Sequence, residues 1–387
     1  MQPPSSSSLS TGAWRAVRRW VVPHRLALFV GMWLVMVLVP PAHAPYGVQQ
    51  GNRPNFQNRF VDGWLRWDVN WYWHIARDGY TNVPEVRGDQ RDTNFFPLLP
   101  LFTRIVSLFT RNLYAAGMLV TNVAFLLAAF LLYKLAALRQ GEEVAERVLI
   151  LLLVYPFSFI FSAMYTESLF LLATVATFYF GEEERWGWAA LAASLAGLTR
   201  VPGVLVPFGL GLLYLEKIRF HPRRLRWNAL WVLAGVAGPV AYMGYLWARF
   251  GDPLLFVKTQ QVAGWMGGTS YHDLLDIAVK TLSFTNLQTG NVDLVPAFGL
   301  LVSVLAAVAC GVCLQRGRIA YGLWGLVTIA VSLKLPASLG RYTMLIFPLY
   351  LVSAERLKGA GLTFVATASS LFGVLMMLMW SHWIFVC

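Results

Sequence analysis

Long hydrophobic runs separated by short polar connections make up most of this chain. They lie at 26–39, 113–137, 145–162, 167–181, 187–200, 203–217, 228–248, 294–314, 319–334, 342–355 and 360–383. Several runs are shorter than the ~20 residues that cross a bilayer upright, so counts between about nine and about thirteen helices fit the pattern. The pattern predicts an all-α polytopic membrane protein with about eleven transmembrane helices.

A polar and aromatic stretch at residues 62–100 is the largest interruption of this pattern. Side chains on one helical face recur there at Trp64, Trp67, Asp68, Trp71, Tyr72 and Ile75. This stripe predicts a helix over 64–77 that lies along a membrane surface and ends before Gly79. Pro97 favours the first turn of a second short helix over 97–110.

Asp68 is the only carboxylate in the aromatic stripe, and it lies at the expected lipid boundary. We expect it to be the chemical centre of a membrane enzyme. The alternative is an exposed charge on a helix whose tryptophans only anchor the loop to the membrane.

The composition agrees with a membrane protein, because 57% of the residues are hydrophobic and 13% are charged. The net charge of +12 does not indicate nucleic acid, since no basic stripe lies on a soluble module. Basic residues instead occupy short connections, at Lys134, Arg139, Arg147, Arg185, Lys217, Arg219, Arg223, Arg224, Arg226, Arg316, Arg318, Arg356 and Lys358. Their distribution predicts a cytoplasmic N-terminus and an external first loop.

The first residues precede the membrane domain. Residues 1–13 contain little apolar surface, so we expect 1–25 to be a disordered, basic, cytoplasmic N-terminus. Ala42-His43-Ala44 imitates a signal-peptidase site, but Pro45 disfavours cleavage, and a retained first span is expected. Residues 26–387 then form a single transmembrane domain.

Two polar loops are expected on the external side of that domain. The first, 45–111, carries the interfacial helices and most of the nearby acids, at Asp62, Asp68, Asp78, Glu85, Asp89 and Asp92. The second, 249–293, is long enough to form a lid. Asp89 and Asp92 fit a solvated turn better than a cation site. Cys310 and Cys313 fit small-residue packing, because no further ligands complete a zinc site, and we expect no bound metal.

Ionisable residues at the ends of membrane helices are costly and are usually paired or used. Glu167, Arg200 and Arg341 stand at such positions. Ordinary explanations are a helix-start acid for Glu167 and snorkelling for the two arginines. His74 on the Trp-rich helix is more typical of packing than of proton transfer.

Taken together, one external acid and two external arginines suit transfer of a group from a lipid-linked phosphate. The carboxylate of Asp68 would take a proton from an acceptor hydroxyl. The guanidinium groups of Arg200 and Arg341 would hold the phosphate and offset its charge as it leaves.

Several blocks of the sequence resemble those of a known family. They are Arg66 to Tyr72, Ile75 to Tyr80, Asn94 to Pro100, Phe161 to Phe170, Leu198-Thr199-Arg200, Phe250-Gly251-Asp252-Pro253 with Gln260 and Trp265, and Arg341-Tyr342 with Phe347-Pro348. In this order they resemble PIG-V-like mannosyltransferases, which are members of the GT-C superfamily of polytopic glycosyltransferases. The resemblance extends over about residues 20–385 and departs from the family at Trp265-Met266-Gly267, where relatives often have Trp-Gly-Arg.

The resemblance implies a GT-C fold with a large first extracytoplasmic loop that carries two membrane-parallel helices. It further implies a polyprenyl- or dolichyl-phosphate sugar, typically mannose, as donor, with inversion at the anomeric carbon. The loop acid of the family corresponds to Asp68 as general base. Contacts to donor or acceptor are expected from Arg66, Trp67, Trp71, Tyr72, His74, Glu167, Arg200, Arg341 and Tyr342.

The sequence leaves other readings open. One alternative function is a transporter or flippase, since such proteins also use intramembrane charge, although the sequence shows no repeated halves. Another alternative is a non-catalytic GT-C-like assembly subunit. No cofactor or divalent metal is expected, so turnover should survive a chelator. The acceptor is a glycolipid, a glycan or a protein hydroxyl. The excess of arginine over lysine favours a bacterial plasma membrane, with the active site outside, over an endoplasmic reticulum.

Overall fold

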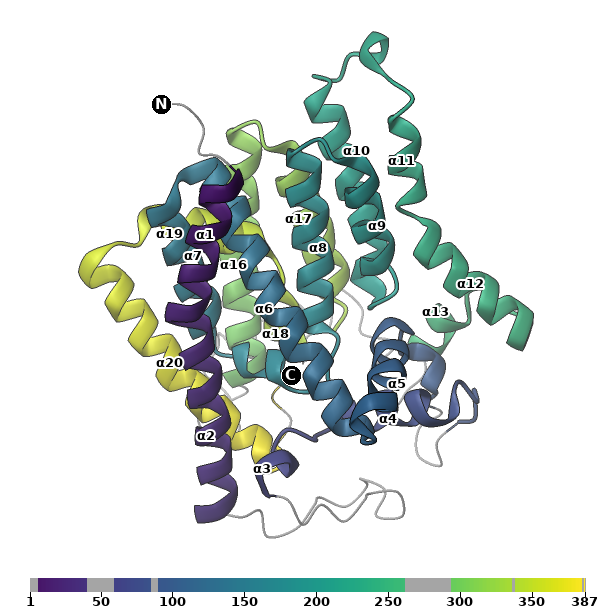
Figure 1. Ribbon diagram of the computed structural model, residues 1–387, viewed down its shortest axis with the longest axis vertical. Coiled ribbons are helices and arrows are strands. Elements are labelled where there is room, and N and C mark those ends of the chain that lie inside the picture. Colours follow the sequence, from purple (N-terminus) through teal and green to yellow (C-terminus); the bar gives the residue numbers. More distant parts are fainter. Residues whose placement is uncertain are drawn as a thin grey trace.

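The computed structural model describes residues 6–39, 59–84, 90–261, 294–335, 338–384 and 386. Within these ranges the chain forms helices joined by turns and contains no strand (Figure 1). The all-α fold class predicted from the sequence is confirmed. Five helices of the described part are long and apolar enough to cross a membrane, at Leu9–Leu38, Leu113–Gln140, Ala229–Phe250, Val295–Gln315 and Gly359–Ser381.

The N-terminal segment is helical, which corrects the expectation of disorder from Ser6 onward. Helix α1 (Ser6–Ala16), a π-helical turn η1 (Val17–Val21) and α2 (Val22–Leu38) continue one another. Small residues let α1 pack closely against α6, where Lys134 Nζ donates to Ser10 Oγ over 3.2 Å. Burial of this helix against the bundle stabilises order that composition alone did not predict.

The central helices follow the predicted apolar runs closely. They are α6 (Leu113–Gln140), α7 (Glu142–Val154), η4 (Ser158–Ser162), α8 (Glu167–Glu182), α9 (Trp186–Ala196), η5 (Val201–Leu205) and α10 (Val206–Lys217). Asn112 caps α6, because its Oδ1 accepts from the backbone N–H groups of Tyr114 and Ala115 at 3.0 Å each. Gly141, at φ +86°, makes the sharp break between α6 and α7.

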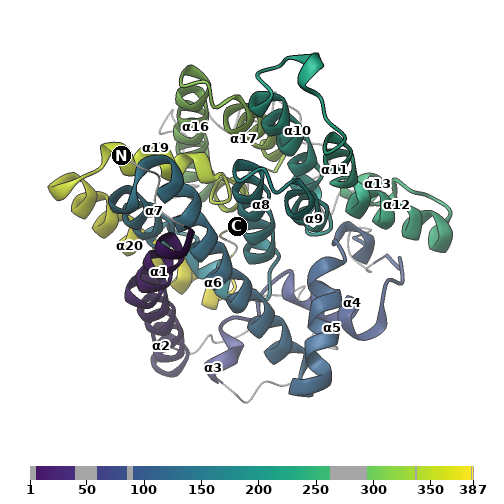
Figure 2. The same cartoon turned by 45° about the horizontal axis from the view of Figure 1, so that its top comes forward.

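The C-terminal half adds helices around this centre (Figure 2). They are η6 (Pro222–Arg224), α11 (Ala229–Ala234), α12 (Ala237–Phe250), α13 (Leu255–Gln260), α16 (Leu294–Gln315), α17 (Ile319–Ser332), α18 (Leu339–Thr343), α19 (Phe347–Arg356) and α20 (Gly359–Ser381). Cys310 and Cys313 are buried and unpaired inside α16, as small-residue packing predicts.

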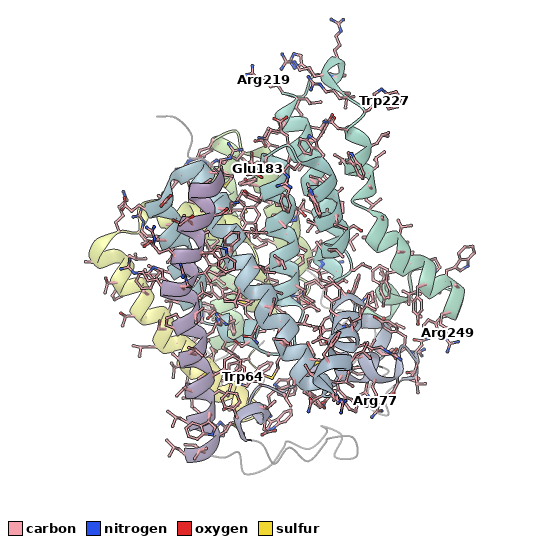
Figure 3. All side chains as sticks on the ribbon, in the orientation of Figure 1. Trp64, Arg77, Glu183, Arg219, Trp227 and Arg249 are labelled. Atoms are coloured by element: carbon pink, nitrogen blue, oxygen red, sulfur yellow. The ribbon has the colours of Figure 1, made fainter. Side chains whose placement is uncertain are left out.

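The bundle has two ends of different character. Figure 3 places Glu183, Arg219 and Trp227 toward one end, here named the α10–α11 end, and Arg77 and Arg249 toward the other. The second end, named the α4–α5 end, carries α3 (Arg59–Asp62), α4 (Val69–Asp78), η3 (Asp92–Asn94) and α5 (Leu98–Thr110). The described part of the polar first loop therefore lies at one end of the bundle.

The two predicted loop helices are both present, with one correction. Helix α5 begins directly after Pro97 and exposes Leu101, Ile105, Leu108 and Phe109 on one face, which is typical of an interfacial helix. Helix α4 ends at Gly79, at φ +80°, but it begins at Val69 and not at Trp64. The predicted stripe over 64–77 is therefore wrong in its first five residues, and the membrane-parallel orientation stays a prediction.

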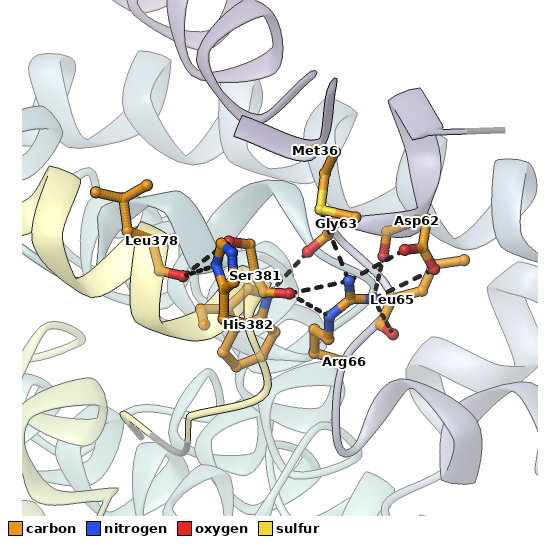
Figure 4. A network of polar contacts seen from close by, with 9 residues as sticks. Met36, Asp62, Gly63, Leu65, Arg66, Leu378, Ser381 and His382 are labelled. Carbon is orange, nitrogen blue, oxygen red and sulfur yellow. Dashed lines mark hydrogen bonds and ion pairs between the residues drawn. The ribbon is translucent and has the colours of Figure 1, made fainter. Parts of the chain in front are cut away.

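Packing against α20 explains why the helix does not extend back to Trp64 (Figure 4). Trp380 Nε1 donates to the Gly63 carbonyl over 3.2 Å, and Arg66 Nε donates to the Ser381 carbonyl over 3.1 Å. The Arg66 guanidinium also pairs with Asp62 at 3.1 Å and lies 4.4 Å from the Trp383 ring centre. These bonds fix the chain in a turn before α4, and Trp67 adopts a left-handed φ of +54°.

Candidate active site

Four charged side chains from distant parts of the chain meet at the α4–α5 end. Asp68 Oδ2 lies 3.3 Å from Arg341 NH1, and Arg341 Nε lies 3.4 Å from Glu167 Oε1. Glu167 Oε1 also accepts from Arg200 NH1 over 2.9 Å. Acid and base therefore alternate along one charged chain, which we name the charge chain, composed of Asp68, Arg341, Glu167 and Arg200.

Three members of the charge chain stand at the start of a helical element, and the fourth lies within one. Asp68 precedes α4, Glu167 begins α8, Arg200 precedes η5, and Arg341 lies in the short helix α18. The Glu167 side chain is fully buried and both arginines are nearly so, whereas that of Asp68 is 23% exposed. Among the four charged groups, the Asp68 carboxylate is thus the most accessible to a ligand.

The backbone around Asp68 directs its side chain away from the helix. Asp68 occupies the N-cap position of α4 but makes no side-chain cap bond. Tyr165 Oη accepts from the Asp68 N–H over 3.1 Å and donates to the Arg66 carbonyl over 3.3 Å. This single hydroxyl bridges the two residues that flank the left-handed Trp67, so it fixes the turn that presents the carboxylate.

Aromatic rings hold the two arginines. The Arg200 guanidinium carbon lies 4.3 Å from the Tyr342 ring centre, and that of Arg341 lies 5.2 Å from Tyr165. Cation–π contact and the shared carboxylate of Glu167 stabilise both charges in a buried place. Tyr72 lies beside them, with its hydroxyl 3.5 Å from Thr166 Oγ1.

The position of Arg341 depends on a close approach between two segments. A Cβ on Gly340 would collide with the Phe157 ring, so this position requires glycine. Tyr155 Oη donates to the Gly340 carbonyl over 2.7 Å, and Ser303 Oγ lies 2.7 Å from Thr343 Oγ1. Residues on both sides of Arg341 are therefore fixed by hydrogen bonds.

The electrostatics of the charge chain favour a proton acceptor at Asp68. Removal from water raises the pKa of Asp68, Arg341 lowers it, and the nearby negative charge of Glu167 raises it again, with a net upward shift. A carboxylate with a raised pKa is a stronger base, in its ionised form, than an ordinary aspartate.

Within the described residues, Glu167 Oε2 and Arg200 Nε are buried and have no hydrogen-bond partner. Buried polar atoms without partners are uncommon, and they mark places where a ligand or water completes the pairing. An anionic group with several oxygens, such as a phosphate, matches the donors of two neighbouring guanidinium groups.

Other residues expected to contact substrate make contacts outside the ion pairs of the charge chain. The Arg66 guanidinium bonds the Ser381 carbonyl at the end of α20. Trp67 packs edge-on against Trp383 at 5.8 Å, and Trp71 stacks on Phe95 at 5.3 Å. His74 lies 3.8 Å from Asp78, and partial burial together with Arg77 lowers the pKa of His74. These four side chains are engaged in packing and local pairing.

Tyr165 and Thr166 also lie at this end but were not among the substrate contacts expected from the sequence. Both directly precede Glu167 in a polar break between apolar runs. The solvated turn predicted at Asp92 is wrong for this residue, because Asp92 is buried and accepts from the N–H groups of Thr81 and Asn82 at 2.6 and 2.9 Å. Asp89 and the segment at Trp265-Met266-Gly267 lie outside the described residues, as does most of the expected lid.

The described residues contain no group of three or more His, Cys, Asp or Glu side chains that would hold a metal ion. Asp252 in the block Phe250-Gly251-Asp252-Pro253 makes local contacts, because its Oδ1 accepts from the Leu254 N–H over 3.0 Å and its Oδ2 pairs with Lys258. The charge chain is thus the main concentration of buried charge at the α4–α5 end of the described chain.

Comparison with known proteins gives a family match. Residues 36–211, a little less than half of the chain, match the family model described as Mannosyltransferase (PIG-V). The match includes Asp68, Glu167 and Arg200 and confirms the resemblance predicted from the sequence. No functionally curated protein is significantly similar to the chain.

Two solved structures of the Archaeoglobus fulgidus oligosaccharyltransferase are similar to this chain. One, in complex with Zn and sulfate, has a TM-score of 0.46 and 13% identity over 93% of this chain and 53% of that chain. The other, tethered with an acceptor peptide containing the NVT sequon, has a TM-score of 0.44 and 12% identity over 94% and 56%. The chain thus spans about half the length of these structures. The family match supports a membrane glycosyltransferase.

Proposed function

We propose that this chain, a PIG-V-like mannosyltransferase by its match over residues 36–211, uses a polyprenyl- or dolichyl-phosphate sugar as donor. It transfers the sugar, most naturally mannose, to a hydroxyl acceptor on the extracytoplasmic side, with a GT-C architecture. The observation that carries the proposal is the charge chain, in which a partly exposed carboxylate lies beside two buried arginines.

The reaction is a single displacement at the anomeric carbon. Asp68 takes the proton from the acceptor hydroxyl as its oxygen attacks, and the bond from the anomeric carbon to the phosphate oxygen breaks. The lipid phosphate leaves with the bonding electron pair, so the products are an inverted glycoside and a lipid phosphate. One base and no covalent intermediate are sufficient for this outcome.

Arg341 and Arg200 bind the donor phosphate and offset the charge that grows on it as it leaves. Glu167 holds both guanidinium groups through one oxygen, at 2.9 Å from Arg200 and 3.4 Å from Arg341. Fixed arginines need no reorganisation during the reaction, and they replace the charge that a divalent ion would supply. Turnover is therefore expected to persist in EDTA.

The basic residues of the short connections support the proposed side of the membrane. Those of the α10–α11 end, including Arg219 and Arg224, suit the cytoplasmic face. The charge chain at the opposite end then faces outside, in a bacterial plasma membrane or, in a eukaryote, toward the lumen of the endoplasmic reticulum. The exposed apolar face of α5 would lie in the membrane interface beside it.

The test is transfer from a radiolabelled polyprenyl-phosphate mannose by the purified protein in lipid, with a broad acceptor extract. Wild type and Asp68→Ala are compared, and other lipid-phosphate sugars replace mannose in parallel. Release of the lipid phosphate that depends on Asp68 supports the proposal. A transporter would move the labelled lipid without consuming it, and an assembly subunit would keep its role in Asp68→Ala; either outcome would overturn the proposal.

A further inference from the structure

The connection between α10 and α11 differs from the other basic parts of the same end. Each of the residues from Arg219 to Trp227 is exposed, and the segment RFHPRRLRW contains four arginines and a histidine with no acid. We name it the 219–227 segment. Its large apolar side chains are also exposed, with Trp227 at 88%.

Three other cations at the α10–α11 end have internal partners. Lys217 pairs with Glu182 at 2.9 Å, and Arg139 and Arg316 pair with Glu182 and Glu355. The arginines of the 219–227 segment form no ion pair with any described residue. The acid nearest in sequence, Glu216, turns inward and accepts from the Ala320 N–H over 3.0 Å. The positive charge of this segment thus lacks a counter-ion within the described chain.

The segment is held in shape at both of its ends. Arg219 and Phe220 adopt left-handed φ angles of +55° and +54°, which turn the chain sharply. The buried Tyr214 of α10 donates from its Oη to Asn228 Oδ1 over 2.8 Å and accepts there from the Arg226 N–H over 3.3 Å. The arginines are therefore presented on a defined turn.

The location of the segment points to its partner. Trp227 stands two residues before the candidate span Ala229–Phe250, and the ends of spanning helices lie at the level of lipid headgroups. Exposed aromatic and apolar side chains enter this interface, while arginines bind the phosphates of anionic lipids. A soluble acidic partner would use the arginines but would leave Phe220, Leu225 and Trp227 without an apolar environment.

We propose that the 219–227 segment is a binding surface for anionic phospholipid headgroups, which anchors the α10–α11 end to the membrane. The arginines supply charge complementarity, and Phe220, Leu225 and Trp227 insert between the headgroups. The inference does not depend on the reaction proposed above, because no member of the charge chain takes part.

The test uses the purified full-length protein in a neutral detergent. Thermal unfolding is followed while phosphatidylglycerol or phosphatidylcholine is added. The wild type is compared with a triple variant, Arg223→Gln, Arg224→Gln and Arg226→Gln. All three side chains are exposed, so this variant should fold normally. A matched control removes the same charge at the α4–α5 end by Arg104→Gln, Arg111→Gln and Arg249→Gln, which are exposed but dispersed over separate elements.

Phosphatidylglycerol should raise the Tm of wild type and of the control, and phosphatidylcholine should do so far less. One arginine near an anionic surface changes affinity about fivefold, so the triple variant should need on the order of 100-fold more phosphatidylglycerol for half of the effect. Added salt should weaken the response of the wild type. Equal stabilisation by both lipids, or an unchanged response in the triple variant, would overturn the proposal.

Discussion

Helix α8 carries a buried glutamate at each end, and the two differ in how completely they are paired. Glu182, at the α10–α11 end, accepts from Arg139 Nε over 3.1 Å, from Tyr321 Oη over 2.7 Å and from Lys217 Nζ over 2.9 Å. Both of its carboxylate oxygens have partners. This cluster joins α6, α8, α10 and α17.

Glu167, about 22 Å away along the helix axis, is arranged differently. One of its oxygens binds Arg200 and Arg341, and the other has no hydrogen-bond partner among the described residues. Arg341 in turn reaches Asp68, whose carboxylate is partly exposed. The first glutamate completes a closed structural cluster, whereas the second belongs to a cluster that a ligand can still enter. The predictions below test that difference.

The largest effect is expected for Asp68→Asn. Loss of the proton acceptor should reduce turnover by about 10²- to 10⁴-fold, because the amide cannot take the acceptor proton. The raised pKa of Asp68 means that its charge does not stabilise the fold at neutral pH, so the variant should unfold at the same temperature as wild type or slightly higher. Transfer assays and thermal unfolding check both parts. Near-normal turnover in this variant would exclude Asp68 as the base.

The next largest effect is expected for Arg341→Gln. This variant should lose roughly 10²- to 10³-fold in kcat/KM, because one phosphate-binding charge is gone. Arg341→Lys should recover only part of this loss, since an ammonium cannot bind phosphate in the bidentate manner of arginine. The KM for donor should rise in both variants. Full recovery by lysine would show that a positive point charge is sufficient at this position.

Substitution of the two glutamates compares the clusters directly. Glu182→Gln leaves Arg139 and Lys217 with an uncharged partner, so the fold should lose about 3 kcal/mol while folded protein keeps its turnover. Glu167→Gln should reduce turnover by roughly 10- to 100-fold, since the two arginines lose the charge that holds them. Thermal unfolding and activity per folded molecule separate these outcomes. Similar activity losses in both variants would contradict the distinction between the two clusters.

Tyr165→Phe should have a smaller effect, about tenfold on kcat with little change in KM. The ring remains in place, but the bridge from the Arg66 carbonyl to the Asp68 N–H is lost, and the carboxylate is less well oriented. Tyr179→Phe is the matched control, because Tyr179 is also buried and bonds Glu183 over 2.6 Å at the other end of α8. An equal loss of kcat in the control would show that Tyr165 acts only through stability.

The smallest expected effect is on the pH dependence of kcat/KM. A base acts when ionised, so kcat/KM should fall as the pH drops through the pKa of Asp68. Because burial raises this pKa, the decline should begin above the pH range near 4 where an ordinary aspartate is protonated. Asp68→Glu, if active, should shift the acid limb. A decline only below pH 4 would contradict a raised pKa.

Much of the fold was predictable from hydrophobic runs. The predicted run at 113–137 lies within α6, and those at 167–181 and 294–314 correspond closely to α8 and α16. Apolar helices can be recognised from local sequence, because burial of a segment in lipid or in the bundle depends on its own side chains. The N-terminal helix was not predicted, since its order comes from packing on α6 and its own composition is polar.

The predicted start of α4 was wrong because of similar long-range packing. The period of the aromatic residues extends the helix back to Trp64, but bonds from Trp380 and Arg66 hold that part of the chain against α20. Nothing near Trp64 in the sequence indicates a partner more than 300 residues away, as Arg66 and Ser381 are. Long-range hydrogen bonds therefore overrode the local helical pattern.

The sequence by itself determined the helical membrane class, the polar first loop and the types of charged residue available for chemistry. It placed Asp68 on the aromatic stripe of the first loop, and it placed Glu167, Arg200 and Arg341 at helix ends, where ionisable groups are tolerated. Only the tertiary structure decided that these four form one chain of ion pairs, that Tyr165 bonds the Asp68 N–H, and that the Arg66 and His74 side chains pair with Asp62 and Asp78. Ion pairs act over a few ångströms, and the packing of distant helices sets those distances.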